Sequence, residues 1–253
     1  MKKKLVLKIG TSTLTAETDR ISRGKIEDIA RQLSALKNDY DIVLVSSGAI
    51  ATAKQFITVH GNKNVSVSKP ALAAIGQPLL MQVYNEIFRD FGLKTAQCLL
   101  TYMDFQHATG KENTLNTITE LLKHDYIPII NENDTVAIEE IILGDNDKLS
   151  ALMANLINAD LLILASDIDG VFDKNPHLNK DAKLIPEIKD LEEVKQFVQE
   201  KGTTLGTGGM TSKINAAEIC FEKNIEMWIV NGGRKNFLLD ALGDKIAFTK
   251  FLN

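Results

Sequence analysis

Short runs of apolar residues recur along the chain, separated by longer segments in which apolar residues return every three or four positions. The short runs are almost continuously apolar, which is typical of strands buried on both faces of a parallel sheet. Six runs are predicted to be strands: Leu5–Ile9, Ile42–Val45, Thr95–Leu100, Tyr126–Ile130, Leu161–Ala165 and Met227–Val230.

The longer segments have the periodicity of amphipathic helices. In one of them Ile26, Ile29 and Leu33 fall on the same helical face. The predicted helices are Lys25–Leu36, Leu79–Phe91, Asn116–Lys123, Leu149–Asn158 and Ser212–Lys223. Strands that alternate with helices of these lengths indicate an α/β sandwich around a mainly parallel sheet.

Composition narrows the class of protein. The 253 residues are 44% hydrophobic and 25% charged, as in ordinary globular chains. A net charge of −4 argues against broad electrostatic binding to nucleic acid, and no apolar stretch approaches the roughly 18 residues of a membrane-spanning helix. Cys98 and Cys220 have neither metal-site nor redox spacing. We therefore expect a cytoplasmic globular protein with two reduced thiols.

Polar clusters follow several predicted strands, at the edge where open α/β sheets bind ligands. In Lys8–Ser12, a lysine at the end of a buried strand needs an anion or open water. In Ser46–Ile50, small residues expose backbone N–H groups to a carboxylate or phosphate. Each cluster has a structural alternative: a lysine extending to solvent in the first, and tight packing of a helix on the sheet in the second.

Two acidic-amide clusters lie further along the chain, Asn131–Asp134 directly after a predicted strand and Gly144–Asp147 before a predicted helix. Clusters of this kind are commonly solvated turns. Their positions also suit a binding pocket, because amide and carboxylate groups together can hold a zwitterion. The spacing does not match an EF-hand calcium loop.

The glycine-rich segment Gly202–Lys213 runs into a predicted helix. Glycines let the backbone approach phosphate closely, and a helix N-terminus presents free N–H donors to it. Lys213 in the first helical turn is unfavourable beside the helix dipole, so a bound anion explains it simply. The segment is neither a Walker A nor a Rossmann sequence, and a flexible linker is the structural alternative.

Two lysines, an anion-binding segment and an acidic-amide pocket together indicate phosphoryl transfer, with Mg²⁺ carried by the nucleotide. The histidines show no paired metal spacing, and none stands out as a general base; they are His60, His107, His124 and His177. A carboxylate acceptor needs no base, because with a pKa of about 4 it is already ionised at pH 7. The residues favour an acyl-phosphate product without identifying the acid.

Six motifs follow one another along the chain: Lys8-Ile9-Gly10-Thr11-Ser12, Ser46-Ser47-Gly48-Ala49-Ile50-Ala51, Ala74-Ile75-Gly76-Gln77, Ile130-Asn131-Glu132-Asn133-Asp134, Gly144-Asp145-Asn146-Asp147-x-Leu149-Ser150-Ala151 and Gly206-Thr207-Gly208-Gly209-Met210-x-x-Lys213. This ordered set resembles the glutamate 5-kinases of the amino-acid kinase family, over essentially the whole chain. The resemblance implies a three-layer αβα sandwich in one domain, with glutamate bound by about residues 1–150 and ATP by about residues 151–253.

The resemblance also implies the reaction, in which ATP phosphorylates the γ-carboxylate of L-glutamate to give L-glutamyl 5-phosphate and ADP, the first step of proline biosynthesis. By motif position, Lys8 and Lys213 stabilise the transferred phosphoryl group, and Asp147 orients these lysines. The implied glutamate-binding residues are Ser47, Asp134 and Asn146. The implied ATP-binding residues are Lys8, Ser166, Asp167, Thr207, Gly208, Gly209, Met210, Thr211, Ser212 and Lys213.

Further expectations come from the resemblance alone: proline as a feedback inhibitor at or beside the glutamate pocket, a homo-oligomer (dimer or tetramer), and glutamyl phosphate reductase as a candidate partner. The chain departs from the pattern at Phe172, where a tyrosine is expected. We also expect a form without the C-terminal PUA domain. Two alternatives stay open: a family member acting on N-acetylglutamate, carbamate, aspartate or a nucleoside monophosphate, and a non-catalytic sensor.

Overall fold

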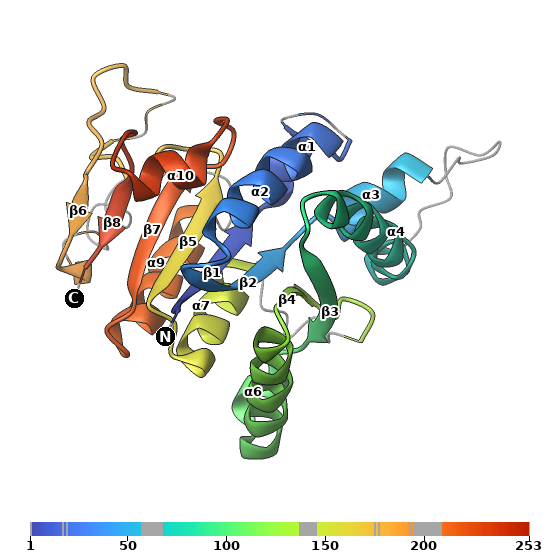
Figure 1. Cartoon of the computed structure of the whole chain (residues 1–253). Helices are drawn as coiled ribbons and strands as arrows, with labels where there is room; N and C mark the ends of the chain where they lie inside the picture. Colours follow the sequence, from blue (N-terminus) through green and yellow to red (C-terminus); the bar gives the residue numbers. More distant parts are fainter. Residues whose placement is uncertain are drawn as a thin grey trace.

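A computed structural model of the chain describes residues 2–16, 18, 20–56, 68–136, 146–174, 176, 178–192, 194 and 209–252. These residues form a sheet of eight strands with helices on both faces (Figure 1). The strands are β1 (Lys3–Ile9), β2 (Tyr40–Ser46), β3 (Lys94–Leu100), β4 (Tyr126–Glu132), β5 (Leu161–Ser166), β6 (Glu187–Ile188), β7 (Glu226–Asn231) and β8 (Thr249–Phe251).

The strand order puts β1 in the middle of the sheet. The order is β3-β4-β2-β1-β5-β7-β8-β6, and the first six of these strands are parallel, whereas β8 runs antiparallel to β7. The chain therefore builds the sheet first on one side of β1 and then on the other. Ligands of open α/β sheets bind where the strand order switches in this way, outside the carboxyl ends of the strands.

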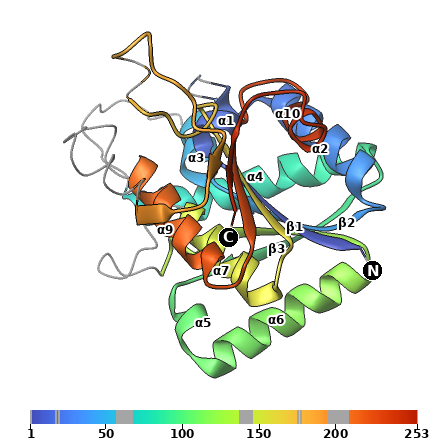
Figure 2. The same ribbon diagram turned by 90° about the vertical axis from the view of Figure 1, so that its left-hand side faces the viewer.

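Helices cover both faces of the sheet. They are α1 (Thr11–Thr15), α2 (Arg23–Leu36), α3 (Ala49–Phe56), α4 (Lys69–Asp90), α5 (Met103–Gln106), α6 (Ala108–Lys123), α7 (Asn146–Ile157), α9 (Gly209–Phe221) and α10 (Phe237–Leu242). Figure 2 shows α2, α4 and α10 on one side of the strands, and α6, α7 and α9 on the other. The predicted three-layer αβα class is confirmed.

The alternation of side chains along β1 decides which layer each one meets. Leu5, Leu7 and Ile9 point into the apolar core shared with α2, α4 and α10. Val6 points into the second core, which is shared with α6, α7 and α9. Since Lys8 lies two positions after Val6, it faces the layer that contains α7 and α9.

All six predicted strands are confirmed, with one difference in burial. We predicted that Thr95–Leu100 is buried on both faces, but β3 is partly exposed along its length. This prediction is wrong because, among the described residues, β3 pairs only with β4 and so forms an edge of the sheet. The described residues of the predicted loop Asp167–Pro186 contain an antiparallel bridge between Phe172 and Leu184.

The five predicted helices are confirmed, but α4 begins at Lys69 rather than at Leu79, and α6 begins at Ala108 rather than at Asn116. Pro70 lies in its first turn, where a missing N–H costs nothing, and Pro78 lies inside the helix. The elements that pattern did not predict are short: α1, α3, α5, α10, β6 and β8. In the described part of the chain, none of the helices combines the length and apolar character needed to cross a membrane.

Candidate active site

Two lysines from distant parts of the chain meet at one buried carboxylate. Lys8 is the penultimate residue of β1, Asp147 lies in the first turn of α7, and Lys213 lies in the first turns of α9. Lys8 Nζ is 2.5 Å from Asp147 Oδ1, and Lys213 Nζ is 3.0 Å from Asp147 Oδ2. Asp147 is fully buried, and both lysines are almost so. The three charges sum to +1 at the carboxyl edge of the sheet.

The Asp147 carboxylate is held in its charged form. Burial by itself raises the pKa of a carboxyl group, but the adjacent ammonium groups of Lys8 and Lys213 more than offset that effect and hold the pKa of Asp147 below its usual value. Ser212 Oγ also donates a hydrogen bond of 3.0 Å to Oδ2. The position of Asp147 at the start of α7 adds the favourable end of the helix dipole.

Lys213 is oriented by its own helix as well as by Asp147. Its ammonium group donates to the Gly209 carbonyl oxygen at 3.0 Å, one turn earlier in α9. The sequence suggested that a lysine at this helix start needs an anion, and the anion that the chain itself supplies is Asp147. Both ammonium groups are held beside the Asp147 carboxylate, so an anionic group that binds there contacts two fixed cations.

A network of uncharged polar side chains adjoins this cluster. Asn146 Nδ2 donates to Ser47 Oγ at 2.8 Å and to Asn131 Oδ1 at 2.9 Å. Asn131 in turn donates to Gln77 Oε1 at 2.9 Å. Because Ser47 Oγ accepts from Asn146, its own hydroxyl proton remains available to a ligand oxygen. Asn146 directly precedes Asp147, so the network and the charged cluster share the start of α7.

The backbone around Ser47 is shaped by close packing. Ser47 N donates to the Ile9 carbonyl at 3.1 Å, which ties the end of β2 to the end of β1. Gly48 has a φ of +106°, a conformation that side chains rarely adopt. Ser46 Oγ is bonded to the hydroxyl of Tyr84 in α4 at 2.8 Å, and burial raises the pKa of that tyrosine. The segment Ser46–Ile50 therefore packs against neighbouring elements and also leaves Ser47 partly exposed at the sheet edge.

Asp134 lies two residues beyond β4, at the same edge of the sheet. It is half-buried, and this burial raises the pKa of its carboxyl group. The preceding residue, Asn133, anchors the turn by donating its backbone N–H to the Leu100 carbonyl at 2.8 Å. A partly desolvated carboxylate in this position suits a cationic ligand group.

The predicted nucleotide-binding residues fall into two segments. Ser166 ends β5 and donates to Asp167 Oδ1 at 3.0 Å, and Asp167 is exposed at the carboxyl edge. Gly209, Met210, Thr211 and Ser212 form the start of α9. Thr207 and Gly208 lie outside the described residues, as do Gly144 and Asp145. Phe172 pairs with Leu184 in the bridge that follows Asp167.

Two polar side chains in this region were not among the predicted site residues. Gln77 and Asn131 were part of the quoted motifs but were not assigned to the site, although both are almost fully buried and connect to Asn146. The available signal for Gln77 was its place in the quoted motif Ala74-Ile75-Gly76-Gln77. Its partner could not be read from the sequence, because Gln77 and Asn131 are 54 positions apart.

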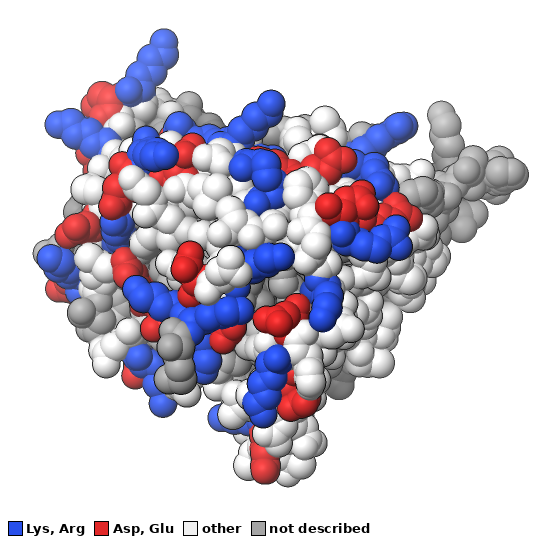
Figure 3. All heavy atoms as spheres, in the orientation of Figure 1, with Lys and Arg blue, Asp and Glu red and all other residues white. Residues whose placement is uncertain are grey.

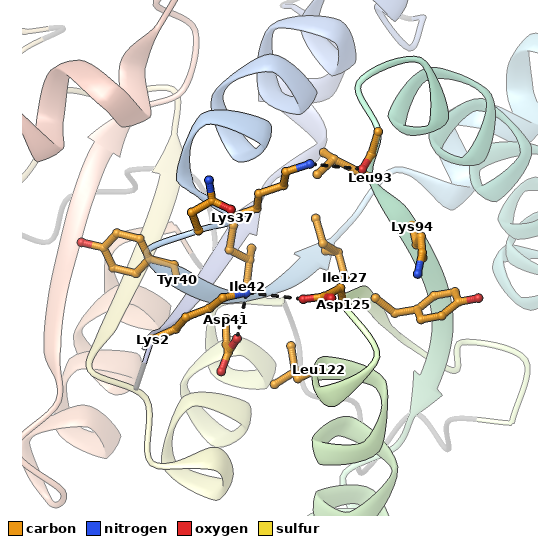
Figure 4. A pocket seen from close by; sticks show the side chains of 13 residues that line it. Lys2, Lys37, Tyr40, Asp41, Ile42, Leu93, Lys94, Leu122, Asp125 and Ile127 are labelled. Carbon is orange, nitrogen blue, oxygen red and sulfur yellow. Dashed lines mark hydrogen bonds and ion pairs between the residues drawn. The ribbon is translucent and has the colours of Figure 1, made fainter.

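A separate hollow lies at the opposite edge of the sheet (Figure 4). Its volume is about 300 Å³, and its lining includes Lys2, Asp41 and Asp125 from the amino ends of strands. Lys2 Nζ lies 3.8 Å from Asp41 Oδ1 and 3.4 Å from Asp125 Oδ1. These three charged side chains are therefore paired with one another. The hollow also lies at the amino ends of the strands, whereas open α/β sheets bind ligands at the carboxyl ends.

Neither the charge on the face drawn in Figure 3 nor the metal-ligating side chains of the described residues indicate another kind of site. On the face shown in Figure 3, Lys and Arg side chains are interspersed with Asp and Glu. Among the described residues, no group of three or more His, Cys, Asp or Glu side chains is arranged to hold a metal ion. The candidate site is therefore the edge that carries Lys8, Asp147 and Lys213.

Comparison with solved structures supports the fold. The chain is similar to the UMP kinase of Ureaplasma parvum, with a TM-score of 0.70 at 18% identity, over 100% of this chain and 100% of the kinase. It is also similar to a carbamate kinase from Giardia lamblia bound to AMP-PNP, with a TM-score of 0.70 at 18% identity, over 100% of this chain and 99% of that kinase. At this level of identity, the likeness concerns the fold alone.

Sequence comparison identifies the family. Residues 3–231 match the model of the amino acid kinase family. The glutamate 5-kinase of Caldanaerobacter subterraneus subsp. tengcongensis is 44% identical over 97% of this chain and 67% of the relative. The glutamate 5-kinase of Clostridium acetobutylicum is 43% identical over 98% of this chain and 94% of the relative. The chain, with its two-lysine cluster at the sheet edge, belongs to the amino acid kinase family.

Proposed function

We propose that this protein is a glutamate 5-kinase, which transfers the γ-phosphoryl group of ATP to the γ-carboxylate of L-glutamate and releases L-glutamyl 5-phosphate and ADP. This reaction is the first step of proline biosynthesis. The observation that carries the proposal is the Lys8–Asp147–Lys213 cluster at the switch point of the sheet. Relatives named glutamate 5-kinase, 43–44% identical over nearly the whole chain, support the choice of substrate.

The two lysines act on the phosphoryl group during transfer. Negative charge on its oxygens meets the ammonium groups of Lys8 and Lys213, which are fixed before the reaction begins. Asp147 orients both ammonium groups through contacts of 2.5 and 3.0 Å. Since the cluster carries a net charge of +1, it attracts an anionic group while remaining compatible with burial.

The acceptor needs no general base, because a carboxylate is ionised at neutral pH and attacks phosphorus directly. We propose that Ser47 and Asn146 hold glutamate through their hydroxyl and amide groups, and that Asp134 accepts from its ammonium group. The contact between Asn146 and Ser47 supports their joint role. Asn131, which is itself bonded to Gln77, orients the Asn146 amide by accepting a hydrogen bond from it.

We propose that ATP lies between the Ser166–Asp167 segment and the start of α9, contacting Lys8, Ser166, Asp167 and the segment Thr207–Lys213. Mg²⁺ is carried to the site by the nucleotide phosphates and is part of the substrate. The position of Ser166 and Gly209 at the same sheet edge as Lys8 supports this placement. In this division, about residues 1–150 bind glutamate and about residues 151–253 bind ATP.

The wider proposal follows the resemblance to glutamate 5-kinases. It comprises a cytoplasmic location, assembly into a dimer or tetramer, feedback inhibition by proline at or beside the glutamate pocket, and glutamyl phosphate reductase as the enzyme that receives the product. The free state of Cys98 and Cys220 is compatible with a reducing compartment.

A substrate panel tests the proposal. ADP release would be measured with ATP and Mg²⁺ in the presence of glutamate, N-acetylglutamate, aspartate, carbamate or UMP, with and without hydroxylamine to trap an acyl phosphate. We expect ADP release with glutamate and formation of the hydroxamate. Activity with another acceptor would overturn the glutamate assignment, and nucleotide binding without turnover on any of the five would indicate a sensor.

The role of Asp134 has its own test. Because its carboxylate faces the ammonium group in the proposal, Asp134→Ala should raise the KM for glutamate by about tenfold or more and leave the KM for ATP nearly unchanged. Steady-state kinetics with each substrate varied in turn would show this. An equal effect on both KM values would place Asp134 outside the glutamate pocket.

A further inference from the structure

Helix α2 carries a row of polar side chains that hold the segment after β7. Lys25, Asp28 and Gln32 lie about one helical turn apart and therefore on one side of the helix. Asp28 Oδ2 accepts from the backbone N–H of Asn236 at 3.1 Å, and Gln32 Oε1 accepts from that of Leu238 at 2.8 Å. The start of α10 is thus attached to α2 by side-chain contacts.

Lys25 reaches the part of this segment that is nearest to the candidate site. Its ammonium group donates to three consecutive carbonyl oxygens, those of Gly232 at 2.7 Å, Gly233 at 3.0 Å and Arg234 at 3.1 Å. The residue is only 8% exposed. Lys25 also lies in the first turn of α2, where the helix dipole disfavours a cation. The three carbonyls compensate for this unfavourable position, since they use every N–H of the ammonium group.

The segment that Lys25 holds is connected to the proposed nucleotide-binding residues. The Gly232 N–H donates to the Ser166 carbonyl at 2.8 Å. Asp169 Oδ1 accepts from Asn231 Nδ2 at 3.0 Å and from Arg234 Nε and Nη2 at 3.1 and 2.8 Å. Residues on both sides of Asp167 are therefore bonded to residues 231–234. A hollow of about 390 Å³ opens at this place, lined by Asp167, Asn231 and Arg234 among others.

The segment after β7 packs closely against α1 and the end of β5. A side chain at Gly232 would meet Thr13 Cγ2 at 2.7 Å and Ala165 Cβ at 2.9 Å. The backbone after β7 thus lies directly against α1 and the end of β5, and a shift of residues 232–234 moves the groups that hold Ser166 and Asp169. Lys25 is 207 positions from Gly232, so this coupling exists only in the folded chain.

We propose that Lys25 is a positioning residue for nucleotide binding. It fixes the carbonyls of residues 232–234, which in turn fix Ser166 and Asp169 on either side of Asp167. The inference rests on the proposed function to the extent that Ser166 and Asp167 contact the nucleotide. It assigns no contact between Lys25 and substrate.

The test compares Lys25→Met with the matched control Arg23→Met. Methionine keeps an unbranched stem and a good helix former but removes the ammonium group. Arg23 lies two positions earlier in α2, where it forms an exposed ion pair with Glu86 at 3.1 Å. We expect Lys25→Met to raise the KM for ATP and the Kd for MgADP by about tenfold, with the KM for glutamate changed by less than about twofold. Arg23→Met should leave all three values nearly unchanged.

A double variant tests the route of the effect. If Lys25 acts through the Arg234–Asp169 contact, Lys25→Met combined with Arg234→Met should raise the Kd for MgADP little more than the larger single change does. A multiplicative effect would overturn this route. Equal changes in the KM values for ATP and glutamate, or an unchanged Kd for MgADP, would overturn the positioning role itself.

Amide hydrogen exchange separates this inference from the proposed function. In Lys25→Met, we expect faster exchange in residues 231–236 and 166–171 than in the wild type, without faster exchange in β1 and β2. This measurement requires neither substrate nor turnover. Unchanged exchange in residues 166–171 would overturn the structural coupling, whereas failure of glutamate to support ADP release would overturn only the proposed reaction. Unfolding curves of each variant show that the comparison concerns folded protein.

Discussion

At the scale of single residues, Asp147 shows how neighbours decide what a side chain does. A fully buried carboxylate is unfavourable by itself, yet here it has an ammonium group on each side. The same contacts hold the ammonium groups of Lys8 and Lys213 beside one carboxylate. A residue that stabilises the folded site also positions the two cations on which phosphoryl transfer depends.

Replacement of Asp147 by asparagine tests this role. Asp147→Asn keeps the shape of the side chain but leaves two ammonium groups together without a counter-charge. We expect kcat to fall by about 100-fold or more, since the lysines lose the carboxylate that orients them. Asp160→Asn is the control, because Asp160 accepts the Lys4 backbone N–H at 2.7 Å at the amino ends of the strands. A kcat within twofold of the wild type would contradict the role of Asp147.

The lowered pKa of Asp147 also predicts a pH dependence of stability. In the unfolded chain, the Asp147 carboxyl group titrates near its ordinary pKa of about 3.9. At pH values between this pKa and the lower pKa of the folded state, the unfolded state therefore binds more protons than the folded state. The stabilisation is complete above about pH 5 and is lost as the pH falls through the folded pKa.

Urea denaturation between about pH 3 and pH 6 measures this effect. We expect the unfolding free energy of the wild type to decrease towards acid pH, and that of Asp147→Asn to decrease less steeply. Parallel pH profiles for the two proteins would show that Asp147 does not contribute.

At the scale of elements, one close helix crossing positions Ser47. Gly76 in α4 lies against α3, and a side chain at Gly76 would meet the Ala49 carbonyl oxygen at 1.8 Å and the Ala53 nitrogen at 2.8 Å. Both contacts are to backbone, which cannot rotate away. Since α3 begins directly after Gly48, any separation of the two helices is transmitted to Ser47.

Two glycine-to-alanine changes should therefore have opposite effects. Gly76→Ala forces α3 and α4 apart, and we expect it to lower the unfolding free energy by about 1–3 kcal/mol. Gly24→Ala in α2 meets nothing within 4 Å, so we expect a gain of about 0.5–1 kcal/mol from the higher helix propensity of alanine. Denaturant unfolding of both variants checks the signs. A neutral Gly76→Ala would mean that the two helices can separate at this crossing without cost.

The elements also show what pattern can predict. Strands such as β5, fully buried along six residues, are continuous apolar runs and were recognised directly. The three residues of β8 and the two of β6 are too short to show a period. The start of α4 was missed because its first turns, Lys69–Gln77, show no regular apolar face, whereas the segment after Pro78 does.

At the scale of the whole molecule, two apolar cores flank one sheet, and the candidate site lies where both reach the carboxyl edge. Leu5, Leu7 and Ile9 belong to one core, and Val6 belongs to the other. Cys220 lies in the second core on α9, fully buried, and this burial raises its pKa to about 12. Cys98 lies on the edge strand β3 and is half-buried.

Thiol labelling reports on this arrangement. In native buffer at about pH 8, we expect a thiol reagent to modify Cys98 well before Cys220, because Cys220 reacts only when α9 separates from the sheet. Mass spectrometry of timed samples gives both rates. Urea just below the unfolding transition should raise the Cys220 rate more than the Cys98 rate. Equal rates in native buffer would contradict the burial of α9 in the second core.

The candidate site was predicted in part. Lys8 lies near the end of a recognisable strand, and Ser47, Asp134 and Ser166 each follow one. Their common position at the carboxyl edge could therefore be expected from a parallel sheet. The amide contacts of Gln77 could not, and neither could the link from Lys25 to residues 232–234. The contacts of Gln77 and of Lys25 both depend on how the helices pack against the sheet, and the local sequence does not indicate this packing.

Local pattern along the chain was sufficient for the α/β class, for the main strands and helices, and for which polar clusters follow strands, because period and turn chemistry are properties of neighbouring residues. The resemblance implied that Asp147 orients Lys8 and Lys213. The tertiary structure alone decided that each ammonium group contacts one oxygen of this carboxylate, that α3 and α4 cross at Gly76, and that α2 holds the segment after β7. These contacts join residues far apart in the chain, so they arise only when packing of the two cores brings those residues together.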